Sequence, residues 1–128
     1  GIVHFSNYYR YMEAAEHEFF RSLGFSIVTR QTDPPVGWPR VHASFDFKHP
    51  LHFEDEFEVR LRVAEKRSRS LTYDFAINKP GDNETVVCAT GRLTVVCVIR
   101  DADGKMVAAP IPDDVAAKID AAPAELSK

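Results

Sequence analysis

The first residues of the chain place groups that can stabilise charge at the start of a candidate helix. Ser6 and Asn7 stand where an amphipathic pattern begins. The first N–H groups of an α-helix have no partner inside the helix and lie at the positive end of its dipole. Such groups can polarise a carbonyl and hold the negative charge that develops on its oxygen during acyl transfer. The backbone of residues 5–7 is therefore a candidate oxyanion site.

Histidines are the second group that could do chemistry. His4 directly precedes the helix start, where its imidazole could orient a substrate or carry a proton. The alternative is a structural role, as a hydrogen-bonded residue beside the helix start. His42, His49 and His52 do not form a metal-ligand spacing with it or with one another, so the sequence predicts no zinc site.

These groups must be positioned by one long helix. Apolar residues recur at steps of three and four from Ser6 or Asn7 to Leu23, which predicts an amphipathic helix. The apolar stripe consists of Tyr8, Met12, Ala15, Phe19 and Leu23, with Tyr9 and Phe20 beside it. Ser6 and Asn7 are predicted to cap its start, and Gly24 is predicted to end it in a left-handed conformation. Glu16 falls inside the stripe, where an unpaired charge is costly, so we expect a salt bridge or a subunit contact there.

The rest of the chain alternates in the manner of strands. Residues 29–40 are rich in proline and glycine and predict a loop. Strands are predicted over 41–48, 56–64, 71–77, 85–100 and 105–108, and a short helix over 113–122. The run 85–100 is apolar on both faces, which predicts a strand covered on both sides. One long helix, four or five antiparallel strands and a short helix indicate an α+β fold with a curved sheet around the helix.

Bulk properties limit the functional classes. The 128 residues suit one domain, 1–128, and a net charge of -3 argues against a dedicated nucleic-acid binder. No apolar run approaches the roughly 20 residues that span a bilayer. Cys88 and Cys97 lie too far apart along one predicted strand to form a disulfide, and reduced cysteines suit the cytoplasm. The chain begins Gly-Ile-Val without a methionine, so we expect its N-terminal strand to be truncated.

Two blocks of the sequence resemble a known family. Residues 1–15, GIVHFSNYYRYMEAA, and residues 50–59, PLHFEDEFEV, followed by residues 66–71, KRSRSL, are similar to the 4-hydroxybenzoyl-CoA thioesterase family, including its Tol-Pal-associated branch. The resemblance implies a hot-dog fold, assembly as a homodimer or homotetramer, and hydrolysis of acyl-CoA thioesters. It implies no cofactor, because coenzyme A is part of the substrate.

The resemblance also assigns roles to residues. It implies that the backbone N–H of Phe5 polarises the thioester carbonyl. The family's catalytic carboxylate is an aspartate about three residues before the motif's glycine, so we expect it upstream of Gly1. Another hot-dog lineage takes its base from about two turns into the helix, which makes Glu13 a candidate general base. The alternative for Glu13 is an ion pair with Arg10 or His17.

Substrate contacts are predicted at two places. Lys66, Arg67, Arg69 and Ser70 form a basic turn that suits the phosphates of coenzyme A, and its alternative is a solvated hairpin tip. Tyr8 and Asn7 are candidate substrate-binding residues at the helix start. Tyr8, Phe5 and Trp38 could line an acyl pocket, although aromatic residues at helical spacing often belong to the core.

Two other functions fit the same fold. One is a hot-dog dehydratase that acts on hydroxyacyl or enoyl thioesters, which needs a histidine and a carboxylate around the helix. The other is a non-catalytic acyl-CoA-binding module, which the absence of the family's aspartate from residues 1–128 keeps open.

Overall fold

The computed structural model describes residues 2–24 and 35–119. A single long helix, α1 (Ser6–Ser22), precedes four long strands, which are β1 (Arg40–Phe47), β2 (Glu58–Lys66), β3 (Ser70–Pro80) and β4 (Thr85–Val96). A short hairpin, β5 (Val98–Arg100) and β6 (Met106–Ala108), and the helix α2 (Asp113–Ile119) follow. Neither described helix is long and apolar enough to cross a membrane. The element order confirms the predicted α+β class.

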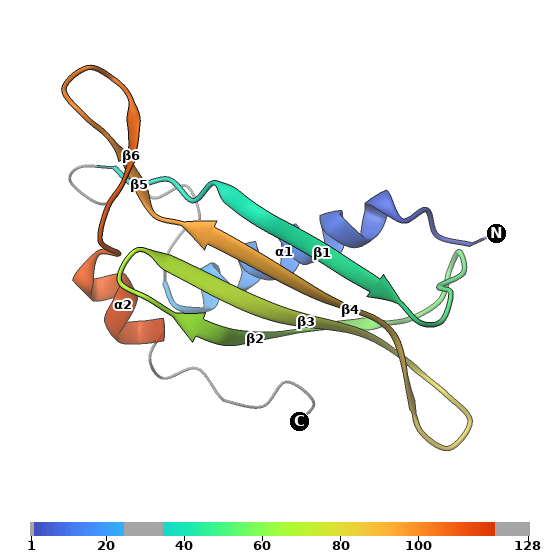
Figure 1. Ribbon diagram of the computed structural model, residues 1–128. Coiled ribbons are helices and arrows are strands. Elements are labelled where there is room, and N and C mark those ends of the chain that lie inside the picture. The colour runs from blue at the N-terminus through green and yellow to red at the C-terminus, as the bar shows by residue number, and fades with distance from the viewer. Residues whose placement is uncertain (1, 25–34, 120–128) are drawn as a thin grey trace.

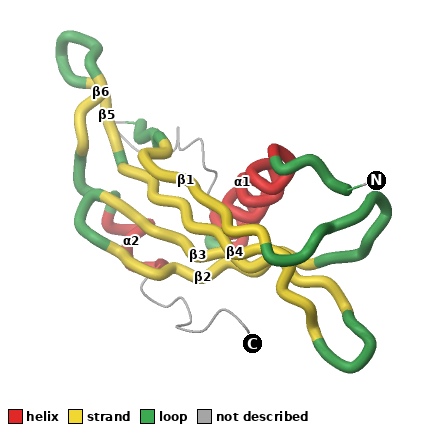
Figure 2. Tube along the Cα trace, turned by 45° about the vertical axis from the view of Figure 1, so that its right-hand side comes forward, coloured by secondary structure: helices red, strands yellow, loops and turns green. Residues whose placement is uncertain are grey.

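The four long strands form one antiparallel sheet in the order β1-β4-β3-β2. Helix α1 lies along one face of this sheet, and the sheet curves around it (Figure 1). Figure 2 shows the same arrangement from a second side, with the β5–β6 hairpin projecting beyond the sheet. One row of side chains on the helix face runs through Phe45, Gly91, Phe75 and Leu61, one from each strand. The core beneath α1 therefore extends across all four strands.

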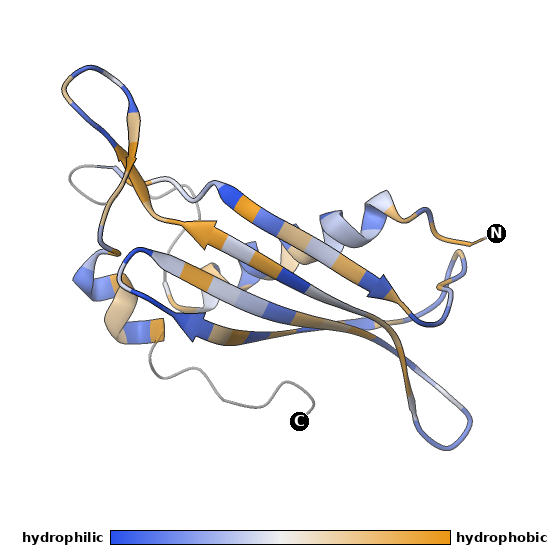
Figure 3. Cartoon of the chain, viewed as in Figure 1, coloured by the Kyte–Doolittle hydropathy of each residue, from blue (hydrophilic) through white to orange (hydrophobic). Residues whose placement is uncertain are grey.

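The opposite face of the sheet is polar. Asp74 on β3 lies between two arginines, 2.7 Å from Arg62 Nη2 and 3.0 Å from Arg92 Nε. Hydrophobic and hydrophilic residues alternate along the strands (Figure 3), as the periodicity predicts. The expectation that residues 85–100 are covered on both faces is wrong for this chain, since the side chain of Arg92 is 53% exposed.

The run 85–100 is also not one continuous strand. It divides at Cys97, between β4 and β5. The N–H of Cys97 donates to Arg69 O at 2.7 Å, and Cys97 O accepts from Ala109 N at 2.9 Å, so its backbone pairs outside the ladder that β4 forms. Apolar composition alone does not reveal this change of partner. Both cysteines are buried and free, as predicted.

The buried face of α1 differs from the predicted stripe. Tyr8, Met12, Glu16 and Phe20 are the buried residues, at a spacing of four. Ala15, Phe19 and Leu23 are only partly buried at the edge of the same core. Glu16 lies at the centre of the buried face, inside the apolar surface of the helix as predicted. Trp38, a candidate for the acyl pocket, packs in this core instead, with its ring 5.5 Å from that of Phe20.

Different groups cap the two ends of α1. At the C-terminal end Gly24 N donates to Arg21 O at 3.0 Å, and Gly24 has a φ of +89°, which confirms the predicted left-handed glycine. At the N-terminal end the prediction of Ser6 or Asn7 as the cap is wrong. Phe5 occupies the cap position without a side-chain hydrogen bond. His4 Nδ1 lies 3.2 Å from Ser6 N and accepts its hydrogen bond instead.

A β-bulge interrupts the pairing of β3 with β4. Ile77 pairs with Ala89 and Asn78 pairs with Val87, so Cys88 is the extra residue. Its carbonyl accepts two hydrogen bonds from the end of β1, from Lys48 N at 2.8 Å and His49 N at 3.0 Å. The bulge thus anchors the segment that leaves β1.

Candidate functional site

A pocket opens at the start of α1. Its volume is about 320 Å³. It lies where three segments meet: the N-terminal residues, the first turn of the helix and the chain leaving β1. The lining residues are Ile2, Val3, Phe5, Tyr8, Phe47, Lys48, His49 and Pro50. Most of these side chains are apolar, and the two polar ones, Lys48 and His49, stand on the same segment.

An aromatic cluster supports the pocket from beneath. The ring of Tyr8 meets those of Phe45 and Phe47 edge to face, at centroid distances of 5.9 Å and 4.9 Å. Phe45 can approach β4 this closely because its partner there is Gly91, where a Cβ atom would lie 2.6 Å from Phe45 Cε1. Burial in this cluster raises the pKa of the Tyr8 phenol. The first turn of α1 is thereby fixed against the sheet.

Phe5, at the helix start, lines this pocket, and its backbone donor differs from those of the residues that follow it. Asn7 N donates to His4 O at 3.0 Å and Tyr8 N donates to Phe5 O at 3.1 Å. Ser6 N is occupied by His4 Nδ1. Among the residues that the structure describes, none accepts a hydrogen bond from the N–H of Phe5. Phe5 is thus the position where a bound carbonyl oxygen could replace water as the acceptor.

His4 lies beside this donor in a structural role. Its Nδ1 is 2.8 Å from Ser6 Oγ in addition to its contact with Ser6 N. Its ring lies 4.6 Å from that of Phe5. These contacts match the alternative stated for His4, a hydrogen-bonded residue at the helix start. A part in proton transfer remains a prediction.

The two helix carboxylates share one arginine. Arg40 Nη2, at the start of β1, forms an ion pair with Glu16 Oε1 and lies 3.6 Å from Glu13 Oε2. The expected salt bridge of Glu16 is therefore present, and the partner of Glu13 is Arg40 rather than the predicted Arg10 or His17. Glu13 does not line the pocket. Its assignment as a general base stays a prediction.

Glu16 sits in a buried polar cluster. Its side chain is fully buried, and burial raises its pKa to about 7 even though Arg40 acts in the opposite direction. Glu16 Oε2, Tyr73 Oη and Trp38 Nε1 are buried without a hydrogen-bond partner in the described part of the chain. Burial also raises the pKa of Tyr73, with the charge of Glu16 as a second cause. The cluster lies in the core and does not reach the pocket.

The basic turn predicted to bind coenzyme A lies at the other end of the sheet. Residues 66–70 join β2 to β3 next to α2, whereas the start of α1 lies at the opposite end (Figure 1). Lys66 Nζ donates to Ala116 O at 3.2 Å, and Arg67 Nη2 lies 2.7 Å from Glu65 Oε1. One copy of the chain does not bring this turn and Phe5 together.

The sequence did not single out Lys48 and His49 as site residues. They follow the last residue of β1, and both are exposed. The only signal in the sequence is their place at the end of an alternating strand, before Pro50. Within residues 2–24 and 35–119, no three His, Cys, Asp or Glu side chains gather in a way that could hold a metal ion.

Comparison with known proteins places this arrangement in a family. Residues 1–119 match the model of the thioesterase-like superfamily. A putative esterase from Aquifex aeolicus is 34% identical over 110 residues, which cover 86% of this chain and 80% of that protein.

Solved structures agree with the family match. A gentisyl-coenzyme A thioesterase is 32% identical with a TM-score of 0.76, over 94% of this chain and 88% of the other. The 4-hydroxybenzoyl-CoA thioesterase of Pseudomonas sp. strain CBS-3 is 21% identical with a TM-score of 0.79, over 92% and 86% of the two chains, and shares the fold. The chain has a hot-dog fold, belongs to the thioesterase-like superfamily and is a thioester hydrolase.

Proposed function

We propose that the pocket at the start of α1 binds the acyl end of an acyl-CoA, and that the protein hydrolyses the thioester to free acid and coenzyme A. The observation that carries this proposal is the free N–H of Phe5 at the edge of an apolar pocket. As the carbonyl carbon is attacked, negative charge gathers on its oxygen. A backbone donor at the positive end of α1 stabilises that charge without having to reorganise.

The pocket walls favour an aromatic acyl group. The rings of Tyr8, Phe5 and Phe47 line it, with Val3 beside them. Aromatic side chains pack well against a flat ring through edge-to-face contacts. The 32% identical relative is a gentisyl-coenzyme A thioesterase, which supports an aryl-CoA as the first substrate to test.

The attacking carboxylate is expected outside residues 1–128. In the described part of the chain no Asp or Glu lines the pocket. The family pattern puts the aspartate about three residues before Gly1. It would therefore lie just upstream of Ile2, which pairs with His52. A carboxylate there would attack the thioester or activate water. Asn7, half-buried in the first turn, remains a candidate substrate contact.

A second copy of the chain would complete the site. Strand β1 is an edge of the sheet, so antiparallel pairing with the β1 of another copy is open to it. That pairing brings the partner's β2–β3 turn to the end of the double sheet where this chain's pocket lies. Lys66, Arg67, Arg69 and Ser70 of one subunit would then face the coenzyme A phosphates bound to the other. We therefore propose that the protein is a homodimer or a homotetramer, and we keep the cytoplasm as its proposed location.

Loss of the backbone N–H of Phe5 tests its role as the oxyanion donor. Proline has no N–H and prefers a φ near -65°, and Phe5 has a φ of -57°, so Phe5→Pro deletes the donor at a position where proline fits. We expect kcat for aryl-CoA hydrolysis to fall by about 10²–10³, as for loss of one oxyanion donor. Phe5→Ala is the matched control, because it removes the ring and keeps the N–H.

Product analysis separates the competing functions. The full-length gene product is incubated with aryl, short-chain and long-chain acyl-CoAs, and free coenzyme A is measured by thiol titration. Release of coenzyme A that Phe5→Pro suppresses more than Phe5→Ala supports the proposal. Hydration of an enoyl-CoA without release points to the dehydratase, and tight binding without turnover points to a binding module. Equal activity of the two variants would rule out the Phe5 N–H as the donor.

A further inference from the structure

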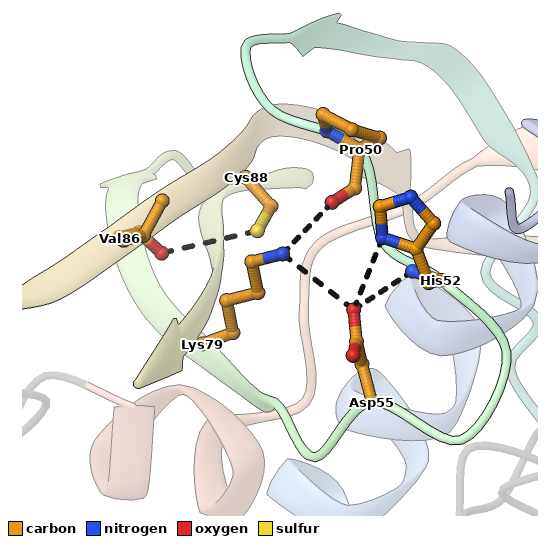
Figure 4. A network of polar contacts seen from close by, with 6 residues as sticks. All are labelled: Pro50, His52, Asp55, Lys79, Val86 and Cys88. Atoms are coloured by element: carbon orange, nitrogen blue, oxygen red, sulfur yellow. Dashed lines mark hydrogen bonds and ion pairs between the residues drawn. The ribbon is translucent and has the colours of Figure 1, made fainter. Parts of the chain in front are cut away.

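A set of polar contacts outside the pocket holds one of its walls. Residues 48–57 connect β1 to β2, and the first three of them line the pocket. Lys79, on β3, crosses to this connection (Figure 4). Its Nζ donates to Pro50 O at 3.2 Å and lies 3.5 Å from Asp55 Oδ2. Lys79 therefore contacts the connection at two points, Pro50 and Asp55, which lie on either side of a turn.

Asp55 closes that turn. Its Oδ2 accepts a hydrogen bond from His52 N at 2.8 Å and lies 3.7 Å from His52 Nδ1. Asp55 N donates to His52 O at 3.1 Å. Glu54, between them, has a φ of +73°, a conformation that a residue with a side chain adopts only when its surroundings hold it there. The His52 hydrogen bond, with Lys79 nearby, keeps the pKa of Asp55 below its usual range.

The same turn holds the backbone that leads to the helix start. Val3 N donates to Leu51 O at 2.7 Å, and Ile2 pairs with His52. The carbonyl that Lys79 holds, on Pro50, belongs to the residue immediately before Leu51. Two residues after Val3, the chain presents the free N–H of Phe5. A continuous path of contacts thus runs from Lys79 to the candidate oxyanion donor.

Lys79 is suited to set a position rather than to react. Its side chain is 23% exposed, and its ammonium group contacts both Pro50 O and Asp55 Oδ2. It lines a different hollow, between the distal part of the β3–β4 hairpin and residues 56–58, and is not among the residues of the pocket at the helix start. A displacement of about 1 Å in a group that stabilises the transition state can cost on the order of 10²-fold in rate. A contact that fixes the peptides around Leu51 therefore acts on catalysis from outside the site.

We propose that Lys79 is a positioning residue of the thioester site. With Asp55 and His52 it holds the turn that binds Val3, and through Val3 it sets the place of the Phe5 N–H. The proposal rests on the proposed function, because it assigns Phe5 the carbonyl oxygen as its partner.

Three variants of the full-length protein test the assignment. Lys79→Met keeps the length and apolar stem of the side chain and removes the charge, whereas Lys79→Arg keeps a cationic donor. Lys105→Met, on the exposed turn between β5 and β6, is the matched control. Amide hydrogen exchange at Val3 and residues 51–52 is followed by NMR without substrate. Values of kcat and KM are measured on an aryl-CoA at a temperature where circular dichroism shows every variant folded.

We expect Lys79→Met to speed exchange at Val3 and to lower kcat, each on the order of tenfold, while KM changes less than about threefold. Lys79→Arg should restore most of both, and the control should change neither. Unchanged exchange, or faster exchange with unchanged kcat, would overturn the assignment. A wild-type protein that hydrolyses no acyl-CoA would instead refute the proposed function, and the exchange data would still show whether Lys79 holds Val3.

Discussion

The start and the middle of α1 hold polar groups in opposite ways. At the start, the N–H of Phe5 has no partner among the described residues, and the ring of Phe5 is 60% exposed beside a pocket. In the middle, roughly three turns further on, Glu16 is fully buried against Arg40. The group with the strongly raised pKa is thus enclosed in the core, whereas the group placed for chemistry is a backbone donor that does not titrate. A shifted pKa on this helix identifies a costly core position rather than the reactive one.

The largest effect should come from breaking the buried pair. Arg40→Ala leaves the carboxylate of Glu16 without its cation in the core. We expect the free energy of unfolding to fall by about 3–5 kcal/mol at pH 8, measured by urea denaturation. Arg21→Ala, which removes an exposed pair with Glu18, is the control and should cost less than about 1 kcal/mol. A loss for Arg40→Ala as small as that of the control would mean that water reaches Glu16.

A second test uses pH. The pKa of Glu16 rises from 4.5 to about 7 in the folded chain because burial penalises the charged form. The folded state therefore binds this proton more tightly than the unfolded state. The resulting stability is fully present below pH 4.5 and is lost as pH rises through about 7.

The magnitude of this loss is on the order of 3 kcal/mol between pH 4.5 and pH 8. Glu16→Gln cannot ionise, so the wild type should become less stable relative to this variant as pH rises. The measurement is a series of urea denaturations of both proteins over that range. Parallel stability curves would show that Glu16 keeps an ordinary pKa, and the contrast between the two parts of α1 would weaken.

The smallest effect is expected at the helix start. His4→Ala removes the acceptor of Ser6 N, a loss comparable to that of an N-cap, at about 1 kcal/mol. His42→Ala, an exposed histidine on β1 near Ser44, is the control. If His4 is only a capping residue, kcat per folded molecule should change less than about tenfold. A loss of several orders of magnitude in kcat with little change in stability would return a catalytic role to His4.

Local patterns predicted most of the elements and part of the site. Alternation located β1, β2 and β3 to within three residues but ran the strand over β4 four residues too far, and Gly24 marked the end of α1. The cap at His4 escaped prediction because Ser6 and Asn7 are the residue types that usually cap, whereas the geometry gives the role to a ring nitrogen. The partner of Glu16 escaped it because Arg40 is 24 residues away and comes close only once β1 lies along the helix.

The pocket wall shows a second limit. Lys48 and His49 face the helix start because the β1–β4 register and the bulge at Cys88 place them there. Neither the register nor the bulge is visible in a single strand's periodicity. The separation between the basic turn and Phe5 depends on the order of the strands in the sheet. The sequence pattern that predicts hairpins does not encode this order.

The bulge at Cys88 separates two parts of the same hairpin. Beyond it, from Asn78 and Val87 to Pro80 and Thr85, the two strands pair with each other, and Lys79 in this part reaches Pro50 O of the pocket segment at 3.2 Å. Inserting two residues into each strand of that distal part, beyond Lys79, keeps every side chain on its own face. Deleting Cys88 would instead remove the carbonyl that anchors Lys48 and His49. The hairpin can therefore change length beyond Lys79 without loss of the contacts that hold the pocket segment, whereas the bulge cannot be removed without losing one of its anchors.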